Sequence, residues 1–179
     1  MLRAEGTPER ILRSVANMLA ASGDYCIADI IDAHGRMRRL EIAHADPSRR
    51  EKLRIAAEDV RHAENGRVAR LLREGSSEMV ASVKRGAASE RLADIVLLRG
   101  ELVRSYIAAA ISVSGTPMAV LTMVKTQARH AFGAGDLAFL EIVADWTGLG
   151  MENALRRELQ PRASVAPPPL EQAQASLPR

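Results

Sequence analysis

Residues 105–125 read SYIAAAISVSGTPMAVLTMVK, and this stretch decides the fold. Two apolar runs, Ser105–Val113 and Met118–Lys125, flank the turn-forming sequence of residues 114–117, which contains a serine, a glycine and a proline. Branched apolar residues favour extended strands, and glycine and proline between two such runs favour a hairpin. We therefore expect these two strands at the centre of an antiparallel sheet.

A second hairpin is predicted closer to the N-terminus. Tyr25–Asp32 is dense in strand-forming residues and stops at a turn that contains Gly35. The extended pattern resumes in Met37–Ala45, so these two runs read as neighbouring strands. The alternation of residues in Ser77–Val83 predicts one further strand.

Helical spacing of apolar residues appears on both sides of these strands. The first helix begins at Thr7 and Pro8, which suit a helix N-terminus, and ends near Ser22 and Gly23. The other segments that we predict to be helical are Pro47–His62, Arg67–Arg73, residues 86–103 and Asp136–Gln160.

The last predicted helix is apolar around most of its circumference. Its acidic residues Glu141, Asp145 and Glu152 share one narrow stripe with Gly148. A helix of this kind must be covered on more than one side, and a second copy packed about a twofold axis would provide the cover. Gly148 and Gly150 each cost a helix about 0.8–1 kcal/mol relative to alanine, and close approach of another helix would compensate. The predicted homodimer interface consists of Leu140, Val143, Trp146, Gly150 and Met151.

Composition limits the kind of protein. The length of 179 residues suits one domain with an appendage, and residues 161–179 hold five of the eight prolines. We predict a domain over residues 1–160 and a disordered tail or linker over residues 161–179. Cys26 is the sole cysteine, which favours a reducing cytosol, and no apolar run is long enough to span a membrane. The net charge of +3 gives little support for nucleic-acid binding.

The element order and several short sequences resemble the GAF domain, a relative of the PAS domain. The similar segments are residues 24–32 with Gly35 and Arg36, residues 43–47, 66–75, 103–105 and 119–123, Phe132 with Asp136, and residues 152–154, which together span about residues 10–158. The resemblance implies an α+β fold in three layers. Its central antiparallel sheet has five to six strands, with the N- and C-terminal helices on one face and short helices on the other.

The resemblance also implies a function. Signalling-type GAF domains of bacteria are sensory or regulatory modules, so we expect a non-enzymatic homodimer that signals through its last helix to a downstream signalling protein. Cyclic-nucleotide-binding relatives are matched only at Phe132 and Asp136, because Leu137 stands where they carry an acidic residue. Methionine sulfoxide reductases of this family work through several cysteines, and Cys26 alone cannot form and resolve a disulfide within one chain.

The family's cavity implies a small-molecule ligand between the sheet and the middle helices. By the resemblance, His44 and Asp46 lie at its mouth. Methionines on strands offer soft, adaptable surfaces, and the hydroxyl group of a buried tyrosine needs a polar partner. The candidate ligand-binding residues are His44, Asp46, Met79, Tyr106 and Met123.

Three alternatives stay open at this point. The chain can be a dimerisation platform without ligand, a GAF-fold enzyme with His44 and Asp46 as its polar pair, or a nucleic-acid-binding accessory that uses the arginines of the first hairpin. The four histidines follow no compact metal-ligand spacing, so no metal site is expected. The sequence requires no other cofactor, and the identity of any cofactor stays open at this point.

Overall fold

The computed structural model describes residues 7–49, 53, 66–83, 95, 102–127 and 131–159. The helices within these ranges are α1 (Thr7–Leu19), the short 3₁₀ helix η1 (Pro47–Arg49), α3 (Arg67–Glu74) and α4 (Ala134–Leu159). The strands are β1 (Tyr25–Ile31), β2 (Met37–His44), β3 (Ser77–Val80), β4 (Ser105–Val113) and β5 (Thr116–Lys125).

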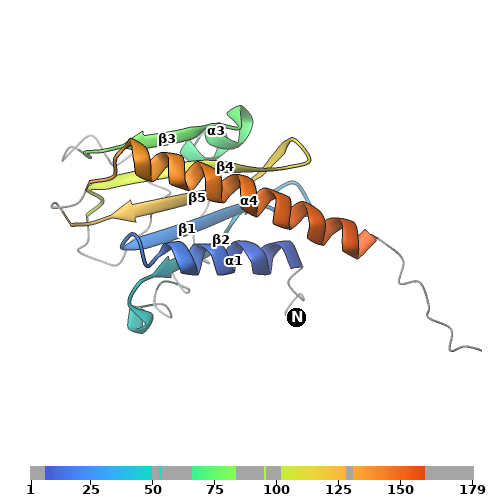
Figure 1. Cartoon of the computed structure of the whole chain (residues 1–179), viewed down its shortest axis with the longest axis horizontal. Helices are drawn as coiled ribbons and strands as arrows, with labels where there is room; N and C mark the ends of the chain where they lie inside the picture. Colours follow the sequence, from blue (N-terminus) through green and yellow to red (C-terminus); the bar gives the residue numbers. More distant parts are fainter. Residues whose placement is uncertain are drawn as a thin grey trace, which may run out of the picture.

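The strands form one five-stranded sheet in the order β2-β1-β5-β4-β3, and every neighbouring pair is antiparallel. Helices α1 and α4 lie side by side over one face of this sheet, and α3 lies on the opposite face (Figure 1). The predicted α+β class, the antiparallel sheet and the placement of the terminal helices are confirmed. We call the two sides of the sheet the α1/α4 face and the α3 face.

The hairpin of β4 and β5 is tighter than the sequence indicated. Val113 pairs with Thr116, so only Ser114 and Gly115 form the turn, and both have positive φ angles of 50° and 77°. Two consecutive residues in this region make the type I′ turn that matches the twist of paired strands. Strand β5 therefore begins at Thr116, two residues earlier than predicted.

The larger core lies on the α1/α4 face. Residues from both helices pack there against alternate residues of the inner strands, and the fully buried ones include Leu12, Ile107, Ile111, Leu121, Leu140 and Met151. Burial of a side chain of this size contributes about 1.5–3 kcal/mol. This apolar layer therefore provides most of the hydrophobic stabilisation that holds the two helices on the sheet.

The glycines of α4 approach parts of the same chain, which corrects the sequence-based interpretation. A Cβ atom at Gly148 would clash with the backbone carbonyl of Ser112 on β4, and one at Gly150 would lie 3.9 Å from the Cγ2 atom of Ile11 on α1. Gly148 therefore allows α4 to lie directly on the sheet. These two glycines do not mark the place where a second copy approaches.

The ends of the two long helices are joined by a hydrogen bond. The backbone N–H of Thr7, at the start of α1, donates to Oε1 of Glu158 near the end of α4, at 3.1 Å. Hydrogen bonds from Thr7 lower the pKa of Glu158 below its ordinary value. A carboxylate at the positive end of a helix is favourable, so this contact fixes the antiparallel alignment of α1 and α4.

Several predicted segments lie wholly or partly outside the described residues. Of the helix predicted over Pro47–His62, the structure describes η1 and the helical residue Leu53, and of residues 86–103 it describes Ile95, Leu102 and Val103. The predicted tail, residues 161–179, lies outside them entirely. In the described part of the chain, no helix combines the length and apolar character that a membrane crossing requires.

Candidate functional site

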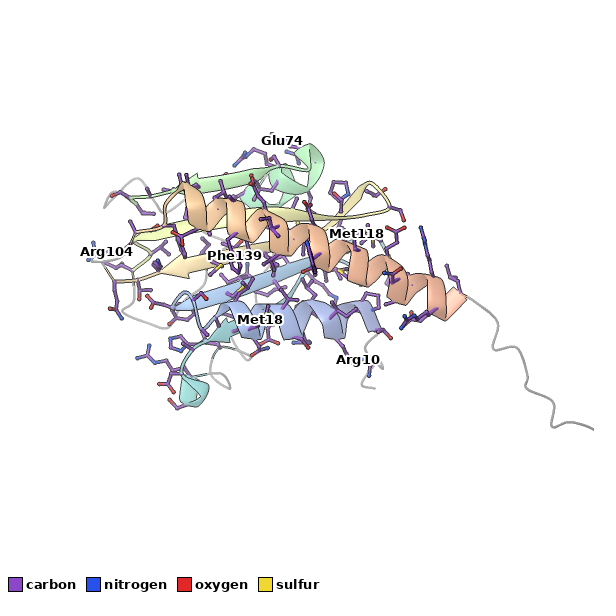
Figure 2. The ribbon with its side chains drawn as sticks, viewed as in Figure 1. Arg10, Met18, Glu74, Arg104, Met118 and Phe139 are labelled. Atoms are coloured by element: carbon purple, nitrogen blue, oxygen red, sulfur yellow. The ribbon has the colours of Figure 1, made fainter. Side chains whose placement is uncertain are left out.

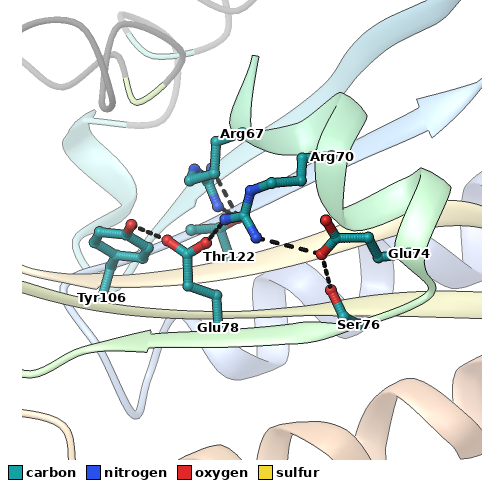
Figure 3. A network of polar contacts seen from close by, with 7 residues as sticks. All are labelled: Arg67, Arg70, Glu74, Ser76, Glu78, Tyr106 and Thr122. Carbon is teal, nitrogen blue, oxygen red and sulfur yellow. Dashed lines mark hydrogen bonds and ion pairs between the residues drawn. The ribbon is translucent and has the colours of Figure 1, made fainter. Parts of the chain in front are cut away.

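The α3 face carries charged and polar groups where the opposite face is apolar. Arg67, the first residue of α3, is 7% exposed, and its Nη1 and Nη2 groups both lie 3.3 Å from the Thr122 hydroxyl oxygen, to which they donate hydrogen bonds. Its guanidinium carbon lies 5.2 Å from the centre of the Tyr106 ring, within range of a cation–π interaction (Figure 3). One arginine therefore connects α3 to both β4 and β5.

Glu78 on β3 continues this group of contacts. Its carboxylate accepts hydrogen bonds from the Tyr106 hydroxyl group and from Arg70, and Arg70 also bonds to Glu74 at 3.4 Å (Figure 3). We call Arg67, Arg70, Glu74, Ser76, Glu78, Tyr106 and Thr122 the α3 network.

The strand register explains why the α3 network forms. Ala108 of β4 pairs with Glu78 on one side and with Thr122 on the other, so the three residues share a face. The small side chain of Ala108 leaves the space that the longer polar side chains occupy. Tyr106 lies two residues before Ala108 and points the same way because side chains alternate along a strand.

A buried ion pair lies on the same face, between β1 and β2. Arg39 donates from Nε to Oδ1 of Asp29 at 2.8 Å and from Nη2 to Oδ2 at 3.2 Å, and both side chains are fully buried. Two parallel bonds of this kind are the strongest form of arginine–carboxylate contact. Removal of one partner would leave a buried charge uncompensated, which costs about 3–5 kcal/mol.

His44 lies at the end of β2, and its surroundings favour the neutral imidazole. Burial lowers the pKa of His44, and the nearby charge of Arg49 adds to this effect. Nδ1 accepts a hydrogen bond of 2.7 Å from the Asp46 backbone N–H, and the ring packs edge-on against Tyr25 with centroids 4.6 Å apart. Asp46 is exposed, and hydrogen bonds from Ser48 lower its pKa.

The five predicted ligand residues are divided between the two faces. His44 and Tyr106 lie on the α3 face, and Asp46 lies in the turn after β2. Met123 is part of the core under α1 and α4, and Met79 pairs with Ile107, whose side chain also belongs to that core. The prediction that Met79 and Met123 line one cavity with Tyr106 is therefore wrong, because odd and even residues of paired strands point in opposite directions.

The sequence interpretation missed most of the α3 network. Arg67 and Thr122 are 55 residues apart in the chain, so no local motif joins them. One signal was present: Thr122 is a hydroxyl residue inside the apolar run MAVLTMVK. A polar residue in the middle of a buried strand needs a partner from elsewhere in the fold.

The cysteine and the potential metal ligands of the described residues do not form a reactive site. Burial raises the pKa of the Cys26 thiol well above its ordinary value, so the reactive thiolate is strongly disfavoured. Among the described residues, no group of three or more histidine, cysteine, aspartate or glutamate side chains has the arrangement of a metal site.

The predicted interface residues on α4 separate into three groups by exposure. Leu140 and Met151 are fully buried in the core, which corrects their assignment to a surface for a second copy. Val143 packs partly against that core, and Gly150 faces α1. Trp146 is 75% exposed, so its side chain is accessible to a second copy as the prediction requires.

The exposed side of α4 carries further large apolar side chains. We call Phe139, Ile142, Trp146 and Leu149 the outer stripe, and their exposed fractions range from 49% to 75%. On the neighbouring helix α1, Met18 is also exposed, and both Met18 and Phe139 are labelled in Figure 2. Monomeric proteins rarely display such contiguous apolar surfaces, which mark interaction sites.

Comparisons with solved structures find similar folds. The chain matches a GAF domain of Synechocystis solved in its photoproduct state, with a TM-score of 0.64 at 16% identity over 86% of this chain and 100% of that one. It also matches the second GAF domain of DevS from Mycobacterium smegmatis, with a TM-score of 0.62 at 15% identity over 84% and 97% of the two chains.

A third similar structure comes from another kind of protein. It is the GAF domain of a phosphoenolpyruvate-protein phosphotransferase from Acinetobacter, with a TM-score of 0.61 at 15% identity over 86% and 87% of the two chains. No curated protein matches the sequence. The GAF domain family model matches residues 7–151, which is most of the chain. The chain therefore belongs to the GAF domain family, a family of regulatory and sensory modules in bacterial proteins.

Proposed function

We propose that this chain is a non-catalytic regulatory module that works as a homodimer, with α4 as both the dimer interface and the output element. The single observation that carries this proposal is the outer stripe. Its four residues follow each other at intervals of three, four and three along one side of α4, and each is about half exposed or more. This spacing is typical of a helix that packs against another helix.

The energetics favour association over a free surface. Full burial of one such side chain contributes about 1.5–3 kcal/mol, and a symmetric dimer buries every stripe residue twice. Rigid-body association costs about 4–15 kcal/mol, so a homodimer that dissociates in the micromolar range is the expected balance.

The α3 face is the proposed sensing side. The buried guanidinium group of Arg67 and the buried Asp29–Arg39 pair lie on the same face as an apolar group formed by Tyr25, Ile27 and Val124. Binding sites for small molecules combine an apolar lining with a few fixed polar groups. A small molecule that contacts this face would change the hydrogen bonds of the α3 network.

Strand β3 connects the proposed sensing side to α4. Glu78 belongs to the α3 network, whereas its neighbour Ser77 donates a hydrogen bond to Glu141 of α4 on the other face. Consecutive residues of a strand point to opposite faces, so a shift of β3 acts on both groups at once. This is the proposed route from the α3 face to the output helix.

Two observations support a non-catalytic role. The Cys26 thiol is buried with a raised pKa, and the Nδ1 atom of His44 already accepts the Asp46 N–H. Neither group is therefore poised as a nucleophile or general base. The sole cysteine is also the basis for placing the module in the reducing cytoplasm.

Light scattering after size-exclusion chromatography tests the proposal. The wild-type chain should elute with twice the monomer mass of 19.4 kDa, and Trp146→Asp should elute as a folded monomer. Leu102→Asp is the matched control, because Leu102 is also an exposed large apolar residue and does not belong to the outer stripe. The proposal is contradicted if the wild type is monomeric or if Trp146→Asp keeps the mass of the wild-type dimer. A far-ultraviolet circular dichroism spectrum verifies that each variant is folded.

A further inference from the structure

Helix α4 carries two rows of side chains along its length, and in both rows successive residues are three or four positions apart. The inner row lies against the sheet and consists of Leu140, Ala144, Thr147, Met151 and Ala154, all buried. One further step of four residues beyond the outer stripe reaches Asn153, which is exposed. We call the outer stripe together with Asn153 the outer row, which consists of residues 139, 142, 146, 149 and 153. Steps of three and four in alternation keep each row on its own side of the helix.

The outer row has the form of a coiled-coil seam. In heptad notation, Phe139, Trp146 and Asn153 occupy a positions, and Ile142 and Leu149 occupy d positions. A seam this narrow fits another helix with the same spacing better than a sheet or a flat surface. Helix α4 of a second copy has that spacing by definition.

We propose that two copies of α4 pair in parallel and in register along this seam. The inference rests on the proposed homodimer and adds its orientation. In this arrangement each residue of the outer row meets its own counterpart, so the four apolar residues stack on one another. Asn153 of each copy then meets Asn153 of the other, and an asparagine pair at an a position is a known determinant of register.

Charges flanking the seam favour the same orientation. In a parallel pair, a g residue lies opposite the e residue five positions later in the other helix. Glu152 is a g residue and Arg157 is the following e residue, so each carboxylate approaches the guanidinium group of the other copy. Glu152 is also bonded to Arg156 of its own chain, so the pairing joins an existing cluster of charges.

The antiparallel alternatives are less favourable. One register matches Phe139 with Leu149 and Ile142 with Trp146, but it brings Asp145 of the two copies together at its centre. The other register places Ile142 against Asn153 and Phe139 against Arg156, which buries polar groups against apolar ones. Like charges at close range and unmatched buried polar groups both disfavour association.

Cysteine cross-linking distinguishes these orientations in the full chain. Cys26 is fully buried with a raised pKa, so the native protein gives a low background. In the parallel dimer, the cysteines of Asn153→Cys face each other across the seam. In the apolar-matched antiparallel register, residue 153 lies near residue 135, about 27 Å along the helix from its counterpart, and Asp145→Cys would cross-link instead.

Under mild oxidation, we expect most of Asn153→Cys to run as a covalent dimer, with Asp145→Cys at least tenfold less cross-linked. Ala33→Cys, in the exposed turn between β1 and β2, is the control for random collision. Preferential cross-linking of Asp145→Cys overturns the proposal, and so does a stable dimer in which neither α4 variant cross-links. A wild type that stays monomeric by light scattering instead refutes the proposed function from which the inference starts.

Discussion

The inner row and the outer stripe of α4 have the same spacing along the helix and opposite surroundings. Leu140 and Met151 are fully buried, whereas Ile142 and Leu149, a few residues away, are 57% and 61% exposed. The inner row packs against the sheet of the same chain, whereas the outer stripe is exposed in the single chain and is the proposed contact with a second copy. The comparison shows that one side of α4 serves folding, while the proposed dimer would give its other side a role in association.

The largest expected effect is a difference in the free energy of unfolding between substitutions in the inner row and substitutions in the outer stripe. Leu140→Ala should lower the free energy of unfolding by about 2–5 kcal/mol, because it leaves a cavity in the core. Leu149→Ala should change the stability of the monomer by less than about 0.5 kcal/mol, because its side chain is mostly in water. Urea unfolding followed by circular dichroism, at concentrations where the dimer dissociates, measures both. Equal losses would remove the distinction between the rows.

Two glycines provide the next test, with effects of opposite sign. Gly148→Ala should destabilise the fold by about 1–3 kcal/mol, since the new methyl group meets the Ser112 carbonyl and α4 must move away from the sheet. Gly150→Ala should stabilise it by about 0.5–1 kcal/mol, because its methyl group would make an ordinary contact with Ile11 and alanine favours the helix. Thermal unfolding of the two variants measures the difference. Stabilisation by Gly148→Ala would contradict the close packing of α4 on β4.

A smaller effect concerns the charges beside the outer stripe. Arg157→Glu should weaken the dimer several-fold, because it places two carboxylates next to each other across the parallel seam, and exposed ion pairs contribute about 0.2–1 kcal/mol each. The double variant Glu152→Arg with Arg157→Glu should recover much of the affinity. Sedimentation equilibrium at low and high salt provides the measurement, and the difference should shrink in high salt. Failure of the double variant to recover affinity would argue against the parallel alignment.

The smallest expected effect lies on the α3 face. Because the folded protein lowers the pKa of His44, the unfolded chain binds more protons below about pH 6.5. The stability contributed by neutral His44 is therefore complete above that pH and declines as the pH falls through its lowered pKa. His44→Gln should flatten the stability profile between about pH 7 and 5. The lowered pKa values of Asp24 and Asp46 act only in more acidic solution, near and below about pH 4.

The local elements could be predicted from the sequence because their signals are local. The β4–β5 hairpin follows from its apolar runs and turn residues, and α3 appears one residue longer than predicted, as Arg67–Glu74. The family resemblance added the layer order, which the structure and the family match both support. The helices predicted over Pro47–His62 and residues 86–103 lie largely outside the described ranges and stay predictions.

The side chains that face each other could not be predicted in the same way. Met123 and Tyr106 lie on neighbouring strands, and only the register, in which Tyr106 pairs with Val124, places them on opposite faces. Similarly, a helix that is apolar on two sides gives no indication of which row faces the sheet. The clash at Gly148 decides this point, because it identifies the side of α4 that touches β4.

The fluorescence of Trp146 tests the central claim most directly, because it is the sole tryptophan of the chain and lies in the middle of the outer stripe. In the dissociated chain its side chain is 75% exposed, so emission should have the long wavelength of an indole in water. As the concentration of the unmodified protein rises through the micromolar range, emission should shift to shorter wavelength as the dimer excludes water from the seam. Emission that keeps its solvent-exposed wavelength while light scattering shows a dimer would contradict the claim that the outer stripe is the interface.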